Sequence, residues 1–380
     1  MYAQMRFRDD AWAAATPAAM GAFAEEHAAE LRAATREGRF PRELYAEMGR
    51  RGWVGPIVPV EDGGIGGGAA EYCLITEEVG RHGLVSPQIS VQGQRWLLVW
   101  GSAEQRERYL APMARGELIF SESISEPGVG SSFKEMRATA ERDGDDWVLT
   151  GSKTHVNLGA ACDVTIFYAM AEEGLTSFLV DMDLPGVSTR QSDPIGLRLL
   201  PTADVVLDRV RVPSSALIGA PGQGLETFLS TFNLSRLGNA SELLGFARRA
   251  LVLGLDYARD RRVGDSVVTD FQGIQWTVAD LWAQLHAAAL SRDLAARVID
   301  DGEDPGFATS VAKKLAIDAA ERVTNDVFAL IGGHGLYHDE EFAQLHSDVK
   351  VLRIAGGSVE ILRNYLARRI LRDDAYEGLR

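Results

Sequence analysis

The carboxy-terminal part of the chain carries a long helical repeat of apolar residues. From residue 222 onward, apolar side chains recur at steps of three and four residues, most clearly at Leu237, Ala240, Leu244, Ala247, Leu251, Leu255 and Ala258. This spacing places them on one face of a long helix. Similar patterns cover residues 271–300, 307–331 and 339–372. Long amphipathic helices with short connections predict an antiparallel four-helix bundle, because that packing buries every apolar face.

The middle of the chain carries strand signals instead. Short runs that favour strands cover residues 118–125, 147–150, 163–170, 176–180 and 204–212, and turn signals such as Asp143-Gly144-Asp145 separate them. Because no helical runs lie between these segments, they predict a small antiparallel barrel or sandwich.

The amino-terminal part is alanine-rich and helical in pattern, with a break at the Gly- and Pro-rich stretch 52–68. Ser102 and Gln105 have capping-box spacing, so a helix should begin after Ser102. A chain of 380 residues exceeds what one hydrophobic core usually organises. We therefore expect an N-terminal helical domain over residues 1–116, a middle β-barrel domain over 117–221 and the C-terminal four-helix bundle over 222–380.

Charge and composition exclude several kinds of partner. The chain has 39 basic and 54 acidic residues, a formal net charge of −15, which disfavours nucleic acid and anionic membranes as partners. No apolar stretch is long enough to span a membrane, and no signal peptide is visible at the amino terminus. The two cysteines, Cys73 and Cys162, have neither metal-site nor disulfide spacing, which fits a cytoplasmic protein. The histidines after residue 333 share no helical face, so no metal site is predicted.

Several segments, in a fixed order along nearly the whole chain, resemble the acyl-CoA dehydrogenase family of flavoproteins. They are Gly52-Trp53 with 59–66, 101–116, Ser125-Glu-Pro-Gly-Val-Gly-Ser131, Gly151-Ser-Lys153, Asp270-Phe-Gln272, Ile331-Gly-Gly-His-Gly335 and 348–363. The resemblance implies an α+β fold with an N-terminal helical domain, a middle β domain and a C-terminal four-helix bundle. It also implies an FAD-dependent oxidoreductase that is a homodimer or homotetramer, acts on an acyl thioester of coenzyme A or of a carrier protein, and passes electrons to a flavoprotein or to oxygen.

The reaction implied by the resemblance is oxidation between Cα and Cβ of the acyl group. A base removes the α-proton while the β-hydride passes to the flavin. Since the α-proton is a very weak acid, the thioester oxygen must be stabilised as negative charge develops on it. The resemblance assigns part of this stabilisation to a backbone N–H, which Gly356 can supply.

The resemblance also implies a set of cofactor-binding residues. These are Ile124, Ser125, Gly130, Ser131, His155, Asn157, Arg261, Gln272, Gly332, Gly333 and Ser358. Arg261 aligns with an arginine that reaches the FAD of a neighbouring subunit. His155 and Asn157 replace the usual tryptophan and threonine, so Asn157 can hydrogen-bond the flavin. His155 either stacks on the flavin or carries a proton near it.

The usual catalytic base is missing from both places where the family carries it. Residues 355–358 read Ala-Gly-Gly-Ser where many members have Tyr-Glu-Gly-Thr, and Ser235 precedes Arg236 where a second group has glutamate. The candidate replacements are Glu122, His155 and Glu242, in that order. Strand alternation places Glu122 opposite Ser125, and about 600° of helical rotation turns Glu242 away from Arg236.

The substrate-binding candidates are Arg95, Ser131 and Arg236. Arg95 either favours a short or acidic acyl group or points to solvent. The absent glutamate leaves alternatives to net oxidation: a non-oxidative or reductive thioester reaction (elimination, reduction or isomerisation), a flavin monooxygenase on the same architecture, or a non-catalytic partner subunit.

Overall fold

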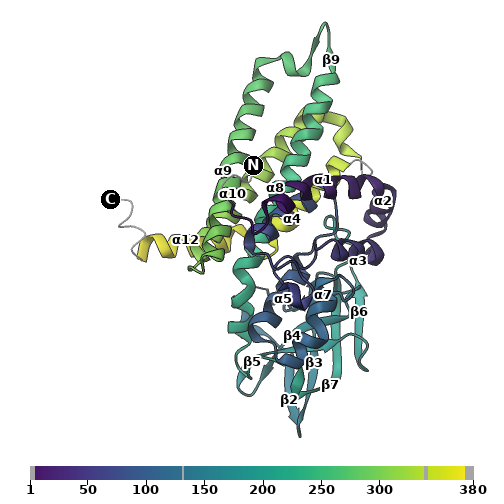
Figure 1. Cartoon of the computed structure of the whole chain (residues 1–380), viewed down its shortest axis with the longest axis vertical. Coiled ribbons are helices and arrows are strands. Elements are labelled where there is room, and N and C mark those ends of the chain that lie inside the picture. The colour runs from purple at the N-terminus through teal and green to yellow at the C-terminus, as the bar shows by residue number, and fades with distance from the viewer. Residues whose placement is uncertain (1–4, 131, 338–340, 373–380) are drawn as a thin grey trace.

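The computed structural model describes residues 5–130, 132–337 and 341–372, and it confirms the predicted order of helical, β and helical parts. Figure 1 shows the long carboxy-terminal helices above, the sheet below, and the amino-terminal helices beside their junction. The bundle helices are α8 (Gly224–Asp260), α9 (Gln272–Asp300), α10 (Gly306–Ile331) and α11 (Glu341–Ile354), followed by α12 (Val359–Arg372). None of the helices among the described residues is long and apolar enough to cross a membrane.

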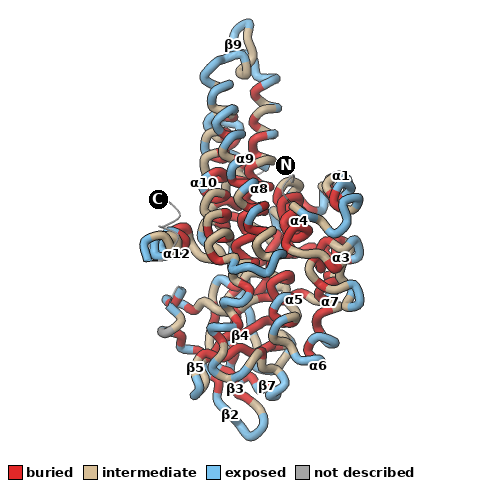
Figure 2. Tube along the Cα trace, turned by 60° about the vertical axis from the view of Figure 1, so that its left-hand side comes forward, coloured by how far each residue is buried: buried red, intermediate tan, exposed pale blue. Residues whose placement is uncertain are grey.

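The predicted apolar stripe on α8 forms the core of this bundle. Leu237, Ala240, Leu244, Ala247, Leu251 and Ala258 are buried, and Leu255 packs against the same core from its edge. Figure 2 shows the buried stretch running through the middle of α8 and the adjacent α4. α8 is therefore the rigid element from which the site residues described below project.

The last predicted helix, over residues 339–372, is wrong as a single element. α11 ends at Ile354 and α12 begins at Val359, while Asp339 lies outside the described residues. Gly356 and Gly357 separate them with φ values of 65° and 89°. Left-handed backbone at two consecutive residues cannot continue a right-handed helix, so a loop forms where the family motif lies.

The amino-terminal helices are α1 (Asp10–Glu26), α2 (Ala28–Glu37), α3 (Arg42–Arg50), α4 (Ala69–His82), α5 (Gln88–Trp100), α6 (Ala103–Gln105) and α7 (Ala111–Ala114). The capping box is confirmed: the Gln105 N–H donates to Ser102 Oγ at 3.1 Å, and the Ser102 N–H donates to Gln105 Oε1 at 2.9 Å. A π-helical turn over Arg106–Leu110 joins α6 to α7.

The middle strands form one eight-stranded sheet in the order β6-β7-β3-β2-β4-β5-β8, with β1 also paired to β4. They are β1 (Phe120–Ser123), β2 (Thr139–Asp143), β3 (Asp146–Val156), β4 (Val164–Ala171), β5 (Gly174–Asp181), β6 (Val187–Gln191), β7 (Ala203–Pro213) and β8 (Leu217–Ile218). The sheet is not wholly antiparallel as predicted, since β1 runs parallel to β4. A small hairpin of β9 (Arg262–Val263) and β10 (Ser266–Val267) lies at the far tip of α8 (Figure 1).

Candidate active site

The segment after β1 forms a tight turn around a buried carboxylate. Glu126 and Val129 exchange backbone hydrogen bonds of 2.9 Å, and Gly128 has a φ of 82° that favours glycine. The Glu126 carboxylate accepts hydrogen bonds from the Arg137 N–H at 2.7 Å and the Lys153 Nζ at 2.8 Å, among others. Burial opposes its ionisation, but these bonds outweigh burial and hold the pKa of Glu126 below its ordinary value. The turn therefore has a fixed shape.

Lys153 and its neighbour also join this turn to the end of β3. Lys153 Nζ donates to the Ile124 carbonyl oxygen at 3.1 Å, and the Thr154 N–H donates to the Ser125 carbonyl oxygen at 2.8 Å. Ser125 consequently lies beside the segment that carries His155. Strand β1 ends at Ser123, so the alternation used to place Ser125 opposite Glu122 does not extend to it.

His155 lies at the end of β3, and Asn157 follows immediately after the strand. His155 is exposed and has a φ of 56°, a left-handed conformation that costs energy in a residue other than glycine. Asn157 is half-buried, and its Oδ1 accepts a 3.3 Å hydrogen bond from Thr202 Oγ1. Strained backbone of this kind clusters at functional sites.

Gly130 lies in open space. Its φ is not positive, and apart from its chain neighbours no atom of the described residues lies within 4 Å of a Cβ built there. Packing among the described residues therefore leaves the space beside Gly130 free for another molecule to approach closely. The same holds for Gly333, whereas Gly332 has a φ of 65° that itself favours glycine. Ser131 lies outside the described residues.

The loop between α11 and α12 is packed against α8 and α10. A Cβ built on Gly356 would overlap Asn239 Nδ2 and lie 3.2 Å from Ser235 Oγ and 3.3 Å from Lys313 Nζ. The place where the family carries its glutamate is thus occupied by polar groups of this chain. Ser358 is half-buried at the start of α12.

Two buried cations lie beside this loop without a carboxylate partner among the described residues. Arg236 bonds Ser310 Oγ at 3.1 Å and lies 4.4 Å from the centre of the Phe232 ring, and its Nε has no hydrogen-bond partner there. Lys313 Nζ donates to the carbonyl oxygens of Ala355 and Gly357. Burial, together with the Arg236 charge, lowers the pKa of Lys313 to about 7. The sequence analysis did not single out Lys313 or Asn239, because their partners are backbone atoms more than 40 residues away.

Glu122 projects from β1 into an aromatic environment. Its strand neighbour is Ile166, two residues before Tyr168 on the adjacent strand, and its Oε1 has no hydrogen-bond partner among the described residues. Burial raises the pKa of Glu122 to about 8. The Tyr168 ring packs at 6.1 Å from that of Phe228.

From Phe228, aromatic side chains continue along α8 toward the loop. The rings of Phe228 and Phe232 are 5.1 Å apart, and Phe232 lies 3.1 Å from the Cβ position of Gly357. Phe133 packs on Phe228 at 5.0 Å. We call Phe133, Tyr168, Phe228 and Phe232 the aromatic row; it connects the surroundings of Glu122 with the Gly356 loop.

The structure does not bring Glu242, the third candidate base, or Arg95 to this region. Glu242 is buried and accepts hydrogen bonds from Ser86 and Gln88, and burial raises its pKa to about 8. It therefore tethers the segment between α4 and α5. Arg95 lies on the exposed face of α5.

A second group of predicted cofactor residues lies at the far tip of the bundle. Arg261, Gly332 and Gly333 line one pocket of about 500 Å³, together with Tyr257 and His334, and the exposed Gln272 begins the adjacent α9. Arg261 follows α8, about 33 Å along the helix from Asn239, counting 1.5 Å per residue. The two groups therefore form separate sites within one chain.

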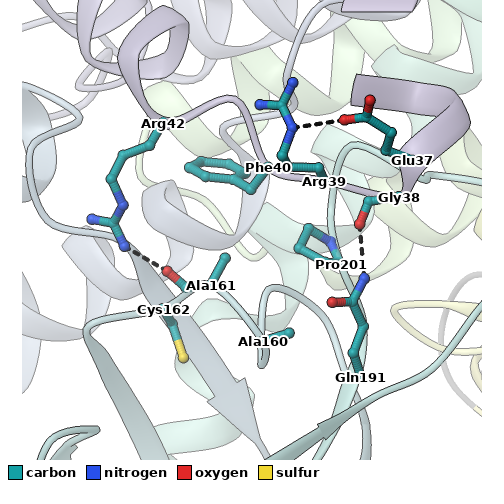
Figure 3. Close-up of a pocket in the computed structure, with 10 residues that line it drawn as sticks. All are labelled: Glu37, Gly38, Arg39, Phe40, Arg42, Ala160, Ala161, Cys162, Gln191 and Pro201. Atoms are coloured by element: carbon teal, nitrogen blue, oxygen red, sulfur yellow. Dashed lines mark hydrogen bonds and ion pairs between the residues drawn. The ribbon is translucent and has the colours of Figure 1, made fainter. Parts of the chain in front are cut away.

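Another pocket lies away from these residues. It measures about 660 Å³ and is formed where the segment between α2 and α3 meets the turns of the sheet (Figure 3). Arg42 donates to the Ala161 carbonyl oxygen at 2.7 Å, and Gln191 donates to that of Gly38 at 2.8 Å. None of the predicted site residues lines it.

Comparisons with known proteins cover the three parts of the chain. Models described as acyl-CoA dehydrogenase N-terminal, middle and C-terminal domains match residues 14–117, 121–210 and 222–371. A 3-(aryl)acrylate reductase from Clostridium sporogenes is 34% identical, with 88% of this chain and 91% of that protein covered.

Two further matches are described with a complex or with a bound cofactor. A subunit of a caffeyl-CoA reductase–Etf complex from Acetobacterium woodii is 29% identical, with 88% and 91% covered. The solved structure of a glutaryl-CoA dehydrogenase from Mycobacterium smegmatis in complex with FADH2 has a TM-score of 0.87 at 26% identity, with 94% of each chain covered.

Proposed function

The chain belongs to the acyl-CoA dehydrogenase family of FAD-dependent oxidoreductases, and from that premise we propose that it acts on an acyl thioester of coenzyme A or of a carrier protein. The observation that most supports this proposal is the continuous aromatic row between Glu122 and the Gly356 loop. FAD, when bound, exchanges a hydride with the β-carbon. The Gly356 N–H holds the thioester oxygen, and the bulky rings of the row favour a short or compact acyl group.

The proposed cofactor contacts follow from the two separate sites. Ile124, Ser125, Gly130, Ser131, His155, Asn157 and Ser358 hold the FAD of their own subunit. Arg261, Gln272, Gly332 and Gly333 contact the FAD of a second copy, because they lie too far along α8 to join the first group. This division supports a homodimer or homotetramer.

Glu122 is the proposed proton carrier. Residue 356 cannot supply a carboxylate, and Glu242 is bonded to Ser86 and Gln88. Glu122 has a pKa of about 8 and no charged partner among the described residues, so it exchanges protons readily near neutral pH. At pH 7 it is mainly protonated, which suits giving a proton more than taking one.

That protonation state favours a second candidate: reduction of an α,β-unsaturated acyl thioester. The β-carbon gains a hydride from the reduced cofactor. The α-carbon gains a proton that Glu122 supplies through water, because the aromatic row separates Glu122 from the Gly356 N–H. Glu122 is then reprotonated from solvent. Two relatives named as reductases of aryl acrylates or caffeyl-CoA support this direction, and the aromatic row suits an aryl group. An electron-transferring flavoprotein is the proposed redox partner, with oxygen as the alternative, because one of these relatives belongs to an Etf complex.

The decisive experiment is anaerobic spectroscopy of the flavin-loaded protein. Mixing the oxidised protein with saturated acyl-CoAs, such as butyryl-CoA and hydrocinnamoyl-CoA, should bleach the flavin if oxidation occurs. Mixing the reduced protein with crotonyl-CoA and cinnamoyl-CoA should restore the flavin colour if reduction occurs. A protein that responds to neither set would contradict the proposed function.

A further inference from the structure

The peptide unit between Ala355 and Gly356 is held from its carbonyl side. Lys313 Nζ on α10 and Asn239 Nδ2 on α8 both donate to the Ala355 oxygen, the latter at 3.2 Å. Lys313 also donates to the Gly357 oxygen at 3.0 Å. Lys313 is fully buried and Asn239 is 5% exposed, so both donors come from packed helix surfaces.

A trans peptide is planar, and its N–H points opposite to its C=O. Fixing the Ala355 carbonyl toward Lys313 therefore fixes the Gly356 N–H in the opposite direction. A cation bound to the carbonyl also polarises the peptide unit, which strengthens the N–H as a donor. One side chain thus controls both the direction and the strength of the bond that Gly356 can make.

We propose that Lys313, assisted by Asn239, is the positioning residue that aims the Gly356 N–H at the carbonyl oxygen of the bound thioester. The inference rests on the proposed function, since it takes an acyl thioester as the ligand of that N–H. Lys313 does not touch the substrate; it acts through the peptide unit. It is a new role for a residue outside the set that the family resemblance implied.

The charges around the loop support this role. Arg236 and Lys313 are both buried and have no carboxylate partner within the described part of the chain. The loop therefore lies beside one buried cation, Arg236, and beside a second whenever Lys313 is protonated. Positive charge at this place favours the negative charge that develops on a thioester oxygen as its α-carbon reacts.

The neighbouring lysine has a different environment from that of Lys313. Lys314 is half-buried on the same helix and forms an ion pair with Asp318, four residues further on. Helix ends and loops are commonly satisfied by glycine or by water, whereas a fully buried ammonium group is costly. Lys314 is also the matched control, because it is the same residue type one position away.

The test compares ligands that differ only at the carbonyl group. Oxidised, flavin-loaded protein is titrated with cinnamoyl-CoA and with its thioether analogue, in which CH2 replaces the carbonyl, and crotonyl-CoA with its analogue is the second pair. The affinity ratio of thioester to thioether measures the bond to the oxygen. Lys313→Met should lower this ratio by about tenfold or more, Lys313→Arg should keep most of it, and Lys314→Met should leave it unchanged.

The outcomes separate the inference from the proposed function. If the wild-type protein binds neither thioester, the proposed substrate class fails and the inference fails with it. If the wild-type protein prefers the thioester and Lys313→Met keeps that preference, only the inference is overturned. A purely structural role for Lys313 would weaken both ligands equally. Should Lys313→Met not fold, Asn239→Ala removes the second donor and should lower the ratio in the same direction, whereas an unchanged ratio there would overturn the inference.

Discussion

The amide group of Asn239 occupies the space in which a side chain at Gly356 would begin. The absence of the usual glutamate is therefore matched by a polar residue on α8 that takes its place. Gly356 also has a φ of 65°, which any other residue adopts at a cost. A carboxylate side chain at position 356 would therefore displace the Asn239 amide and strain the backbone.

Restoring the glutamate without loss of stability should need a second change at Asn239. We expect Gly356→Glu alone to lower the free energy of unfolding by about 2 kcal/mol, through overpacking and backbone strain. Gly356→Glu combined with Asn239→Ala should recover part of that loss, because the added side chain gains room. Chemical denaturation of wild type, the two single variants and the double variant gives a double-mutant cycle of unfolding free energies. Additive losses would show that the two positions do not interact.

Glu122 should set the pH dependence of the chemical step. If the protein reduces unsaturated thioesters, the rate of flavin reoxidation should fall as pH rises through about 8, where Glu122 loses its proton. If it oxidises saturated thioesters, the rate of flavin reduction should rise over the same range. Glu122→Gln should lower the rate by about 100-fold and remove the pH dependence.

Stopped-flow spectroscopy between pH 6 and pH 10 measures both rates. The exposed Glu135 offers a matched control, since Glu135→Gln changes a carboxyl group of the same type outside the aromatic row. An unaltered pH profile in Glu122→Gln would assign the proton to another group.

Breaking the buried ion pair between Lys153 and Glu126 should lower the stability far more than breaking an exposed one. Lys153→Met leaves the Glu126 carboxylate buried without its cation, which we expect to lower the free energy of unfolding by about 3 kcal/mol. It should also weaken FAD binding, because Lys153 holds the turn that carries Ser125. Arg190→Leu removes the exposed partner of Asp204 and should change stability little. Thermal unfolding with and without FAD compares the two variants.

Gly130 and Gly151 should respond to alanine in opposite ways. Gly130→Ala should leave the stability of the FAD-free protein unchanged and weaken FAD binding by about tenfold or more, since the added methyl group meets only an approaching ligand. Gly151→Ala should destabilise the protein with or without FAD, because its Cβ would lie 2.5 Å from that of Ala138. Flavin fluorescence titration measures the affinity for FAD, and thermal unfolding measures the stability. Equal FAD affinity in Gly130→Ala and wild type would remove Gly130 from the cofactor site.

Glu242 should make the folded state less stable as pH rises from 4.5 to about 8. Its pKa is raised from 4.5 to about 8 on folding, so its stabilising contribution is complete below pH 4.5 and is lost as pH rises through about 8. Glu242→Gln cannot ionise, and its stability relative to wild type should therefore increase between pH 5 and pH 8. Thermal unfolding of both proteins across this range tests the trend.

The arrangement of the helices was predictable from the sequence because burial of one helix face makes apolar residues recur at regular spacing. The apolar series on α8 and the capping box before α6 both follow from local spacing. The break between α11 and α12 was missed, although the pair Gly356-Gly357 was its signal, because the helical pattern continues on both sides. The parallel pairing of β1 with β4 depends on long-range contacts, which no local pattern records.

The candidate site was predictable only where residues that are close together in the sequence form a motif. The turn after β1 could be identified by its glycines, and the structure adds the buried Lys153 that fixes it. The contacts of Asn239 and Lys313 with residue 355 join segments 116 and 42 residues apart. The sequence analysis ranked Glu122 before Glu242 as a candidate base, but it could not show the hydrogen bonds from Ser86 and Gln88 that occupy Glu242.

The pocket at Arg261 and Gly333, remote from the turn that carries Ser125, has a thermodynamic consequence. If two copies complete one cofactor site, each FAD molecule links two chains, and cofactor binding and subunit association reinforce each other. Diluting the protein should then release flavin even when the total flavin concentration is held constant. The cofactor would then stabilise the contact between subunits, so that loss of FAD and dissociation of the assembly occur together.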